Sequence, residues 1–165
     1  MAQDKNTNSR RAFLSRSGKA GAALAAAATL TARETSAAPP RQAARRKKVV
    51  AGSPSPAYSR AVAFGDLVFV AGCVGVDKNG KIQSYFETEA GQTLLNLKES
   101  VERSGSSLEK VLKCTCFLKD YADFQMFNKV YTKFFPRNPP ARSTVVVKDF
   151  VVPGAKLEVD CVCHL

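Results

Sequence analysis

The chain has 165 residues, of which 45% are hydrophobic and 24% are charged, and its formal net charge at pH 7 is +11. This length suits one domain, and the composition excludes a collagen-like, low-complexity or disulfide-dense protein. Residues 1–37 hold six basic and two acidic residues, and a basic run follows at Arg41, Arg45, Arg46, Lys47 and Lys48. What remains carries about +2. We therefore expect no nucleic-acid partner, and we interpret the basic run as a solvated tail.

Residues 1–37 have the ordered features of a bacterial export signal. Arg10 and Arg11 precede Ala-Phe-Leu, which is the pattern of a twin-arginine signal. The apolar stretch from Ala20 to Leu30 is too short for a membrane-spanning helix, which needs about 20 residues. Small residues at the first and third positions before the expected cut predict cleavage after Ala37. We expect a signal peptide over 1–37, a periplasmic or extracellular protein and no membrane anchor; the alternative is a disordered basic tail.

The folded domain is expected to span residues 47–165, after a linker rich in Pro, Ala and Arg at 38–46. Apolar and β-branched runs predict three strands, over residues 47–51, 61–64 and 67–74. A helix is predicted next, beginning with a capping box from Ser84 to Glu87 and ending before Gly105. Its apolar residues recur at helical spacing, at Ala90, Leu94, Leu97 and Val101.

The second half of the domain alternates strands with one more helix. Three strands are predicted, over residues 111–118, 143–147 and 156–162. Asp120 or Asp123 is expected to cap the helix, and prolines from Pro136 onward end it. Its aromatic stripe is expected to lie in the core, at Phe124, Phe127, Tyr131 and Phe134. The order βββ-α-β-α-ββ is typical of an α+β fold with two helices on one face of the sheet, and the apolar open face predicts an oligomer.

The cysteines form no recognisable metal or redox motif. There are five, at Cys73, Cys114, Cys116, Cys161 and Cys163. Two Cys-x-Cys pairs could in principle bind a metal, but zinc sites favour two to four intervening residues. We interpret the cysteines as small buried core residues and expect no metal. The single histidine, His164, rules out a multi-histidine centre and a histidine-based triad.

Arg142 and Glu158 are the best candidates for chemistry. Arg142 stands where a proline-stiffened loop enters a strand, and its planar guanidinium suits a carboxylate held by two hydrogen bonds. Glu158 and Asp160 alternate with apolar residues in the last strand, where acids need a partner or a function. The alternatives are an ordinary ion pair between Arg142 and Glu158, or a half-exposed polar face.

The segment Asn138-Pro-Pro-Ala-Arg-Ser-Thr-Val145 resembles the signature of the Rid family, also called YjgF, of reactive-intermediate imine deaminases. The resemblance extends over residues 49–162. Further similar blocks follow in the family's order, at Ala57–Val62, Gly65–Gly72, Leu94–Lys98, Phe117–Asp120, Asp123–Tyr131 and Pro153–Asp160.

The resemblance implies a chorismate-mutase-like α+β fold with a mixed sheet, assembled as a homotrimer whose sites lie in clefts between subunits. It also implies hydrolysis of enamines and imines, such as 2-aminoacrylate, to 2-keto acids and ammonia without a cofactor. By resemblance, Arg142 binds the substrate carboxylate, and Glu158 and the backbone of Thr144 contact the attacking water. The remaining substrate-binding positions are Tyr58, Asn128 and Gly72.

Two departures from the family pattern bear on substrate range. Ala71-Gly72-Cys73 stands where the family often has Ser-Gly-Gln, and Pro56-Ala57-Tyr58 replaces Gly-Pro-Tyr. A non-catalytic protein that binds small carboxylates through the same cleft is the main alternative. A nucleic-acid or translation-inhibiting role, sometimes ascribed to this family, is disfavoured by the small charge of the domain.

Changing both Arg10 and Arg11 to lysine should retain the precursor in the cytoplasm, because the arginine pair is the feature of the predicted signal that directs export. Cell fractionation followed by immunoblotting measures the distribution. An unchanged periplasmic yield would contradict the predicted export route.

Overall fold

The computed structural model of the chain describes residues 46–51 and 56–165. The predicted signal peptide over 1–37, with Arg10, Arg11 and Ala37, and nearly all of the linker over 38–46 lie outside the described residues. The export prediction therefore stays a prediction. Within the described part of the chain, no helix is long and apolar enough to cross a membrane.

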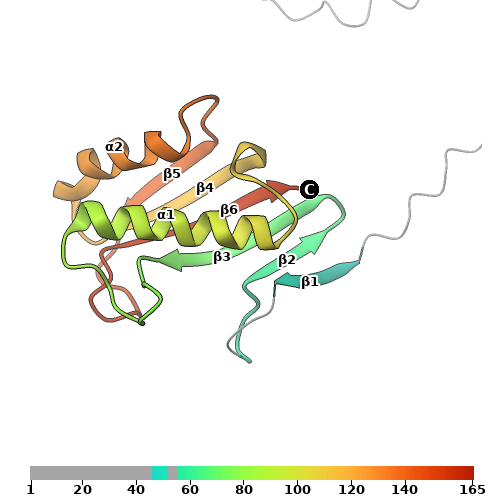
Figure 1. Cartoon of the computed structure of the whole chain (residues 1–165), viewed down its shortest axis with the longest axis horizontal. Coiled ribbons are helices and arrows are strands. Elements are labelled where there is room, and N and C mark those ends of the chain that lie inside the picture. Colours follow the sequence, from blue (N-terminus) through green and yellow to red (C-terminus); the bar gives the residue numbers. More distant parts are fainter. Residues whose placement is uncertain (1–45, 52–55) are drawn as a thin grey trace, which may run out of the picture. The chain divides into compact units, whose positions relative to one another are not determined.

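The described strands form one six-stranded mixed sheet in the order β1-β2-β3-β6-β4-β5 (Figure 1). Their bounds are β1 Lys47–Ala51, β2 Ala61–Phe64, β3 Leu67–Val74, β4 Val111–Leu118, β5 Ala141–Val146 and β6 Leu157–His164. The β4–β5 pair is parallel, because a helix connects the two strands, and the other neighbours are antiparallel. The last strand along the chain, β6, therefore lies between β3 and β4 in the centre of the sheet.

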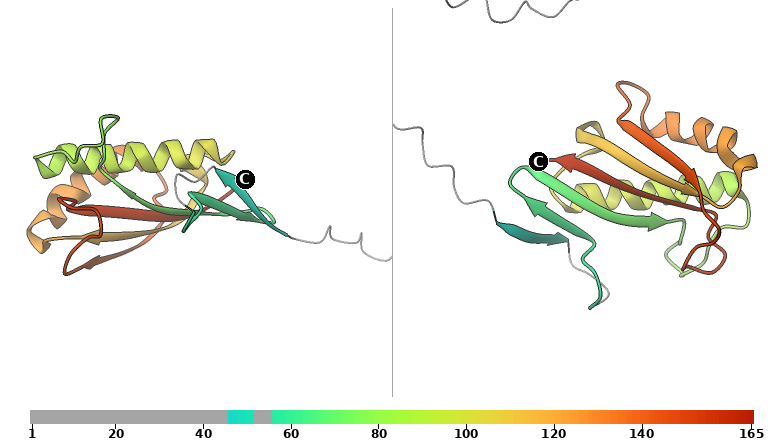
Figure 2. Two further views of the ribbon diagram at one scale, coloured as in Figure 1. Left: turned by 90° about the horizontal axis from the view of Figure 1, so that it is seen from below. Right: turned by 180° about the vertical axis from the view of Figure 1, so that it is seen from behind.

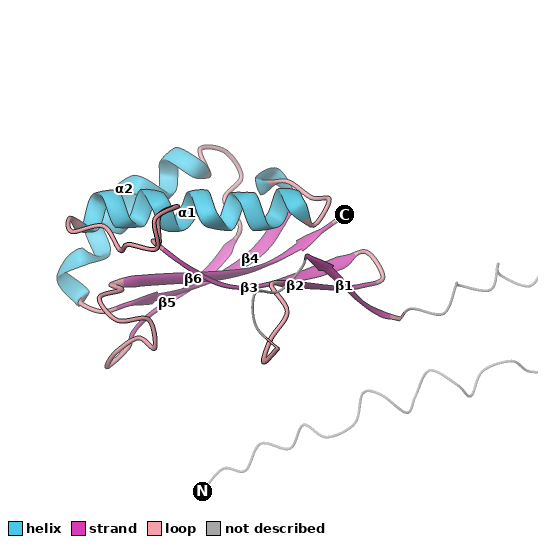
Figure 3. Ribbon diagram, turned by 60° about the horizontal axis from the view of Figure 1, so that its bottom comes forward, coloured by secondary structure: helices cyan, strands magenta, loops and turns pink. Residues whose placement is uncertain are grey.

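The two α-helices of the described region, α1 (Phe86–Arg103) and α2 (Phe124–Phe134), lie on the same face of the sheet (Figures 2 and 3). Side chains of β6 alternate, and its odd-numbered residues are buried beneath the helices. Leu94, Leu97 and Phe127 meet this layer from the helices and are 0–1% exposed. The predicted α+β class, element order and placement of both helices on one face are confirmed.

The ends of several elements differ from the prediction. The capping box was wrong: Tyr85 is the N-cap residue of α1 and makes no side-chain capping bond. Ser84 lies one position too early, and the Thr88 hydroxyl instead donates to the Tyr85 carbonyl at 2.8 Å. Gly105 follows the helix with φ +85°, as predicted for a glycine beyond the C-cap. Asp120 accepts from the Ala122 amide at 2.8 Å and so caps the short 3-10 turn that leads into α2.

The two C-terminal strands also begin and end at other residues than predicted. The strand expected over 143–147 spans Ala141–Val146, because it starts directly after the prolines of the preceding loop. The strand expected over 156–162 spans Leu157–His164, because its end pairs with the start of β3, His164 opposite Leu67.

All five cysteines lie in the described region, and all are buried and free. Those of β4 and β6 face the helices, and Cys114 pairs directly with Cys161 across the two strands. Burial raises the pKa of the Cys116 thiol to about 12, so this thiol stays protonated at neutral pH. The interpretation of the cysteines as core residues is confirmed.

The opposite face of the sheet is not covered by a helix and carries large apolar side chains. Leu67, Phe69 and Val145 are 38–48% exposed there. Leu67 pairs with His164 and Phe69 with Val162, which places them on the face that the helices leave open. Such a face favours contact with a second protein surface, and the expected oligomer stays a prediction.

The core should respond to cavity formation beneath α1. Leu97→Ala is expected to lower the free energy of unfolding by about 2–5 kcal/mol, because Leu97 is fully buried. Leu95→Ala is the matched control on the same helix: Leu95 is 50% exposed, and the loss should be within about 0.5 kcal/mol. Urea unfolding followed by circular dichroism measures both. Equal losses would contradict the packing described here.

Candidate active site

Arg142 is the second residue of β5, and α2 holds its side chain. Its Nη2 donates to Asn128 Oδ1 at 2.6 Å. The guanidinium carbon lies 4.6 Å from the ring centroid of Tyr131 and 5.2 Å from that of Phe127, with Phe124 at 5.9 Å. Cation–π contacts of this kind favour the charged group while leaving its in-plane donors available. Arg142 is therefore oriented before any ligand binds, with further N–H groups left for a carboxylate.

The backbone of Thr144 is available at the same edge of the sheet. β5 is an edge strand, paired only with β4. The Val147 amide donates to the Leu118 carbonyl at the end of β4, at 2.9 Å. Because backbone polar groups alternate in direction along a strand, those of Thr144 point away from β4 toward the unpaired edge. Thr144 pairs with Cys116, a buried residue, so its side chain lies on the same face as that of Arg142.

Glu158 lies on the other face of the sheet. It is the second residue of β6, where it pairs with Val74 of β3 and Phe117 of β4. Its carboxyl group extends over Gly72: a Cβ added to Gly72 would lie 1.8 Å from Glu158 Oε1. Only glycine leaves room for this arrangement. A β-bulge between Val70 and Cys73 brings Gly72 to this position.

Glu158 also lines a cavity of about 220 Å³ whose other walls are mostly apolar. The remaining lining residues are Phe117, Val147, Asp149, Phe150 and Val151. Burial raises the pKa of the Glu158 carboxyl above its ordinary value, and the negative charge of Asp160 on the same strand raises it further. A carboxylate with a raised pKa binds a proton more readily than an ordinary one, which suits a general base.

Tyr58 and Gly72 both line a second cavity, of about 440 Å³, which also includes Arg60 and Asn96. Tyr58 is 53% exposed. Gly72 thus connects the region of Tyr58 with the carboxyl group of Glu158.

The predicted site residues therefore form two groups in one chain. The arginine cluster consists of Asn128, Arg142 and Thr144, and the glutamate cluster consists of Tyr58, Gly72 and Glu158. Arg142 shares a row of the sheet with Cys114 and Cys161, which face the helices, whereas Glu158 shares a row with Phe117 and Val145 on the open face. Strand β4 separates the two clusters.

An ion pair between Arg142 and Glu158, one of the alternatives considered from the sequence, is thus wrong for a single chain. The partner of Arg142 within the chain is Asn128. Phe127 and Tyr131, which the aromatic stripe predicts in the core alone, also contact Arg142. The spacing could have predicted this shared contact, because residues 124, 127, 128 and 131 lie three or four positions apart on one face of the helix.

Known proteins resemble this chain over the described domain. Residues 50–165 match the model of the family described as Endoribonuclease L-PSP. Reactive Intermediate Deaminase A, chloroplastic, of Arabidopsis thaliana is 37% identical over 123 residues, which are 71% of this chain and 65% of that protein. The match thus spans just under two thirds of the Arabidopsis protein. RutC family protein y4sK of Sinorhizobium fredii is 40% identical over 110 residues, 66% of this chain and 86% of the relative.

Solved structures agree with the fold. RidA from an Antarctic Psychrobacter has a TM-score of 0.65 at 28% identity, covering 72% of this chain and 96% of its own. E. coli TdcF with bound serine has a TM-score of 0.64 at 30% identity, covering 71% and 94%. The family model covers most of the chain and nearly all of the described domain. The chain therefore belongs to the Endoribonuclease L-PSP family, the Rid or YjgF family that the sequence motifs resemble.

Proposed function

We propose that this protein hydrolyses reactive imines and enamines of the 2-aminoacrylate type to 2-keto acids and ammonia. The observation that carries the proposal is the pair of prepared groups, an oriented guanidinium at Arg142 and a partly buried carboxyl at Glu158. An Arabidopsis relative is named Reactive Intermediate Deaminase A, and TdcF has been solved with serine, an amino acid that carries a carboxylate. The first name supports deamination, and the second supports a small ligand with a carboxylate.

Hydrolysis of an imine requires that the substrate and a water molecule be positioned and that protons be transferred. An imine carbon is already electrophilic, and Arg142 would hold the substrate through its carboxylate by two hydrogen bonds. Glu158 would accept a proton from water as the oxygen adds to the imine carbon and would return it to the nitrogen, giving a neutral carbinolamine. The hydroxyl proton of the carbinolamine would then pass through Glu158 to the nitrogen as the C–N bond breaks, leaving ammonia and the keto group. An enamine first gains a proton on its terminal carbon and so becomes the imine.

The two clusters can serve one substrate only if two copies of the chain meet. Within one chain β4 separates Arg142 from Glu158, and their side chains lie on opposite faces of the sheet. We propose that the edge strand β5 of one copy approaches the open sheet face of the next, in a homotrimer. The arginine cluster of one subunit would then face the glutamate cluster of its neighbour. The exposed apolar side chains of the open face favour such an assembly.

A protein that only binds small carboxylates is the second candidate. It is favoured by Ala71, which provides no hydroxyl beside Gly72 where the family often has serine. Arg142 would serve both functions, so binding alone cannot separate them, whereas ammonia release can. We do not extend the term endoribonuclease to this chain, because the domain beyond the basic run carries a net charge of only about +2.

Two substitutions separate binding from hydrolysis. Arg142→Lys keeps the charge but loses the paired donors, and should lower turnover about ten- to a hundredfold, since a charged hydrogen-bonded contact contributes roughly 1.5–3 kcal/mol. Glu158→Gln keeps the shape but cannot accept a proton, so binding of a 2-keto acid should survive while hydrolysis falls. The assay is ammonia release from imines generated in situ by an amino-acid oxidase, with calorimetry for binding.

Arg137→Lys and Glu102→Gln are matched controls, because both residues are exposed and lie outside the two clusters. Wild-type turnover in Arg142→Lys would show that the site is elsewhere. A wild-type protein that binds 2-keto acids through Arg142 but releases no ammonia from any imine would favour the carboxylate-binding function.

Arg142→Lys and Glu158→Gln copies should complement each other within one oligomer. In a mixed trimer, one of the three interfaces would combine the native glutamate of one variant with the native arginine of the other. Coexpression with two different affinity tags, followed by tandem purification, should therefore restore about a third of wild-type ammonia release.

The control for complementation pairs Arg142→Lys copies with copies that carry both substitutions, which restores no native site. Light scattering on the same samples measures the oligomer. Mixed trimers without recovered activity would contradict a site shared between subunits, and a stable monomer at micromolar concentration would contradict the assembly.

A further inference from the structure

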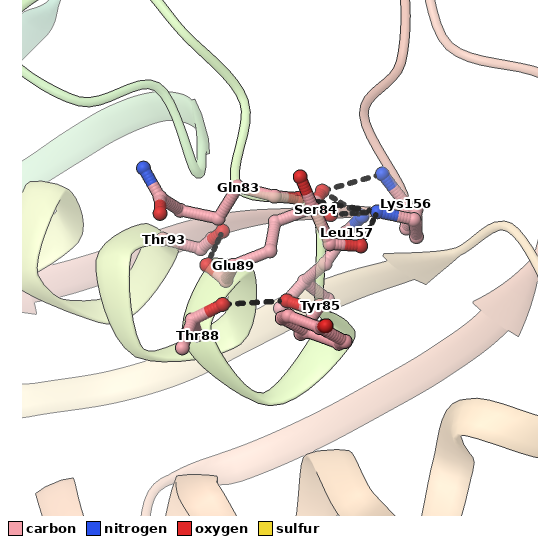
Figure 4. Close-up of polar contacts among 8 residues, drawn as sticks. All are labelled: Gln83, Ser84, Tyr85, Thr88, Glu89, Thr93, Lys156 and Leu157. Atoms are coloured by element: carbon pink, nitrogen blue, oxygen red, sulfur yellow. Dashed lines mark hydrogen bonds and ion pairs between the residues drawn. The ribbon is translucent and has the colours of Figure 1, made fainter.

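Glu89 is a fully buried carboxylate that the proposed reaction does not use. It lies in the first turns of α1 and is 0% exposed. Its Oε1 accepts from the backbone amides of Lys156 and Leu157, at 2.5 and 3.3 Å, and its Oε2 accepts from Lys156 Nζ at 3.0 Å (Figure 4). A buried carboxylate is costly unless it is paired and hydrogen-bonded, and Glu89 has both kinds of partner.

These contacts fix the chain directly before Glu158. Leu157 is the first residue of β6 and Glu158 the second. Because side chains alternate along a strand, the orientation of the Leu157 backbone determines which way Glu158 points. Lys156 is held further through Nζ, which donates to the carbonyls of Gln83 and Ser84 at 3.3 and 3.2 Å.

The same contacts hold one end of the loop that lines the Glu158 cavity. This loop runs from Val147 to Lys156 and supplies the cavity with Val147, Asp149, Phe150 and Val151. Its first end is fixed to β4 by the hydrogen bond from the Val147 amide to the Leu118 carbonyl. Its second end is fixed by Glu89 and by the Lys156 carbonyl, which accepts from the Lys119 amide at 2.9 Å.

Two glycines of one short segment make room for the two glutamates. A Cβ on Gly72 would lie 1.8 Å from Glu158 Oε1. A Cβ on Gly75 would lie 2.6 Å from Glu89 Cγ and 2.7 Å from the Glu89 carbonyl oxygen. Glu158 packs against this segment from the open face of the sheet, while Glu89 reaches it from α1 on the helix face. A displacement of either glutamate therefore disturbs the segment that the other one contacts.

We propose that Glu89, together with Lys156, is a positioning residue that fixes the direction of the Glu158 carboxyl and closes its cavity. The catalytic part of this inference rests on the proposed function. The claim that Glu89 positions the Glu158 carboxyl does not rest on the proposed function, because it concerns only the surroundings of that group. Glu89 touches no substrate in this arrangement and acts only through β6 and the cavity loop.

The test compares Glu89→Gln with Gly75→Ala. Glu89→Gln keeps the shape but weakens the contacts with Lys156, whereas Gly75→Ala keeps the Glu89 charge and displaces the residue by contact with its backbone. Gly91→Ala is the matched control, because the same substitution on α1 meets nothing within 4 Å. Urea unfolding first identifies the variants that fold.

The first measurement is the titration of the Glu158 carboxyl by carbon-13 NMR, assigned with Glu158→Gln. Burial raises the pKa of this group, so opening the cavity to water should lower it toward the ordinary value in both variants. Asp160, whose charge acts on Glu158, and Asp149, which lines the same cavity, are unchanged in both variants. A shift in both variants and none in Gly91→Ala supports the proposal; a wild-type titration in both folded variants overturns it.

The second measurement is ammonia release. Turnover should fall about ten- to a hundredfold in both variants while KM changes little, since misplacement of a catalytic group costs rate and the arginine cluster is not touched. Loss of substrate binding with unchanged turnover would overturn the inference. If the wild type releases no ammonia, the proposed function fails, and the Glu158 titration still tests the positioning role. Should Glu89→Gln not fold, Lys156→Met is expected to shift the titration in the same direction, and an unshifted titration overturns the proposal.

Discussion

The alternation of side chains along β6 is the constraint on which both the core and the candidate site depend. β6 is the last strand along the chain and lies in the middle of the sheet, so both of its faces are used. The apolar face packs beneath α1 and α2, and the other face presents Glu158 and Asp160. A shift of one residue in register would bury the acids and expose Leu157 and Val159, which the cost of burying two carboxylates prevents. The position of Glu158 is thus set by the same packing that stabilises the domain.

Arg142 is oriented by a different set of contacts from those that place Glu158. It belongs to an edge strand whose outer backbone is unpaired, and the preceding loop places Asn138 at φ +47° before two prolines. Asn128 takes one of its donors, and aromatic rings of α2 flank the guanidinium. This lowers the entropy that would be lost when a carboxylate binds. Because Arg142 faces the helices and Glu158 faces away from them, the geometry of a single sheet favours a site that is completed between copies.

Local patterns predicted much of the fold. β-branched runs gave β2, β3 and β4 with the observed bounds, and helical spacing gave both helices. The N-terminus of α1 was misassigned, because Ser-x-x-Glu also occurs one position away from a cap, and only the tertiary contacts of Lys156 decide where the chain turns. Residue type and position singled out Arg142 and Glu158, and the resemblance gave both of them roles in one site. The two side chains lie on opposite faces of the sheet because of how β5 and β6 each pair with β4. The residue spacing within a single strand does not reveal this pairing.

The role of Glu89 was missed for a similar reason. In the sequence, Glu89 is one of two acids in the first turn of a helix, where acids are ordinary surface residues that complement the helix dipole. Only the fold brings Gly75 beneath it and the Lys156 amide against it. Gly72 and Gly75 give the clearest trace of such contacts, since each leaves space that a glutamate occupies.

The departures from the family pattern at Ala71 and Cys73 lie within β3, and the structure gives them different surroundings. Cys73 faces the helices: it is buried, and its Sγ lies 3.7 Å from the Ser100 hydroxyl of α1. Cys73 also lines the second cavity, together with Gly72 and Tyr58, so its replacement of a family glutamine changes both the core beneath α1 and that cavity. Ala71 differs, because it precedes Gly72 within the bulge, and its amide donates to the Arg60 carbonyl at 2.9 Å. The residue at position 71 thus lies beside the glycine that accommodates the Glu158 carboxyl, whereas the residue at position 73 acts on the core and on the second cavity.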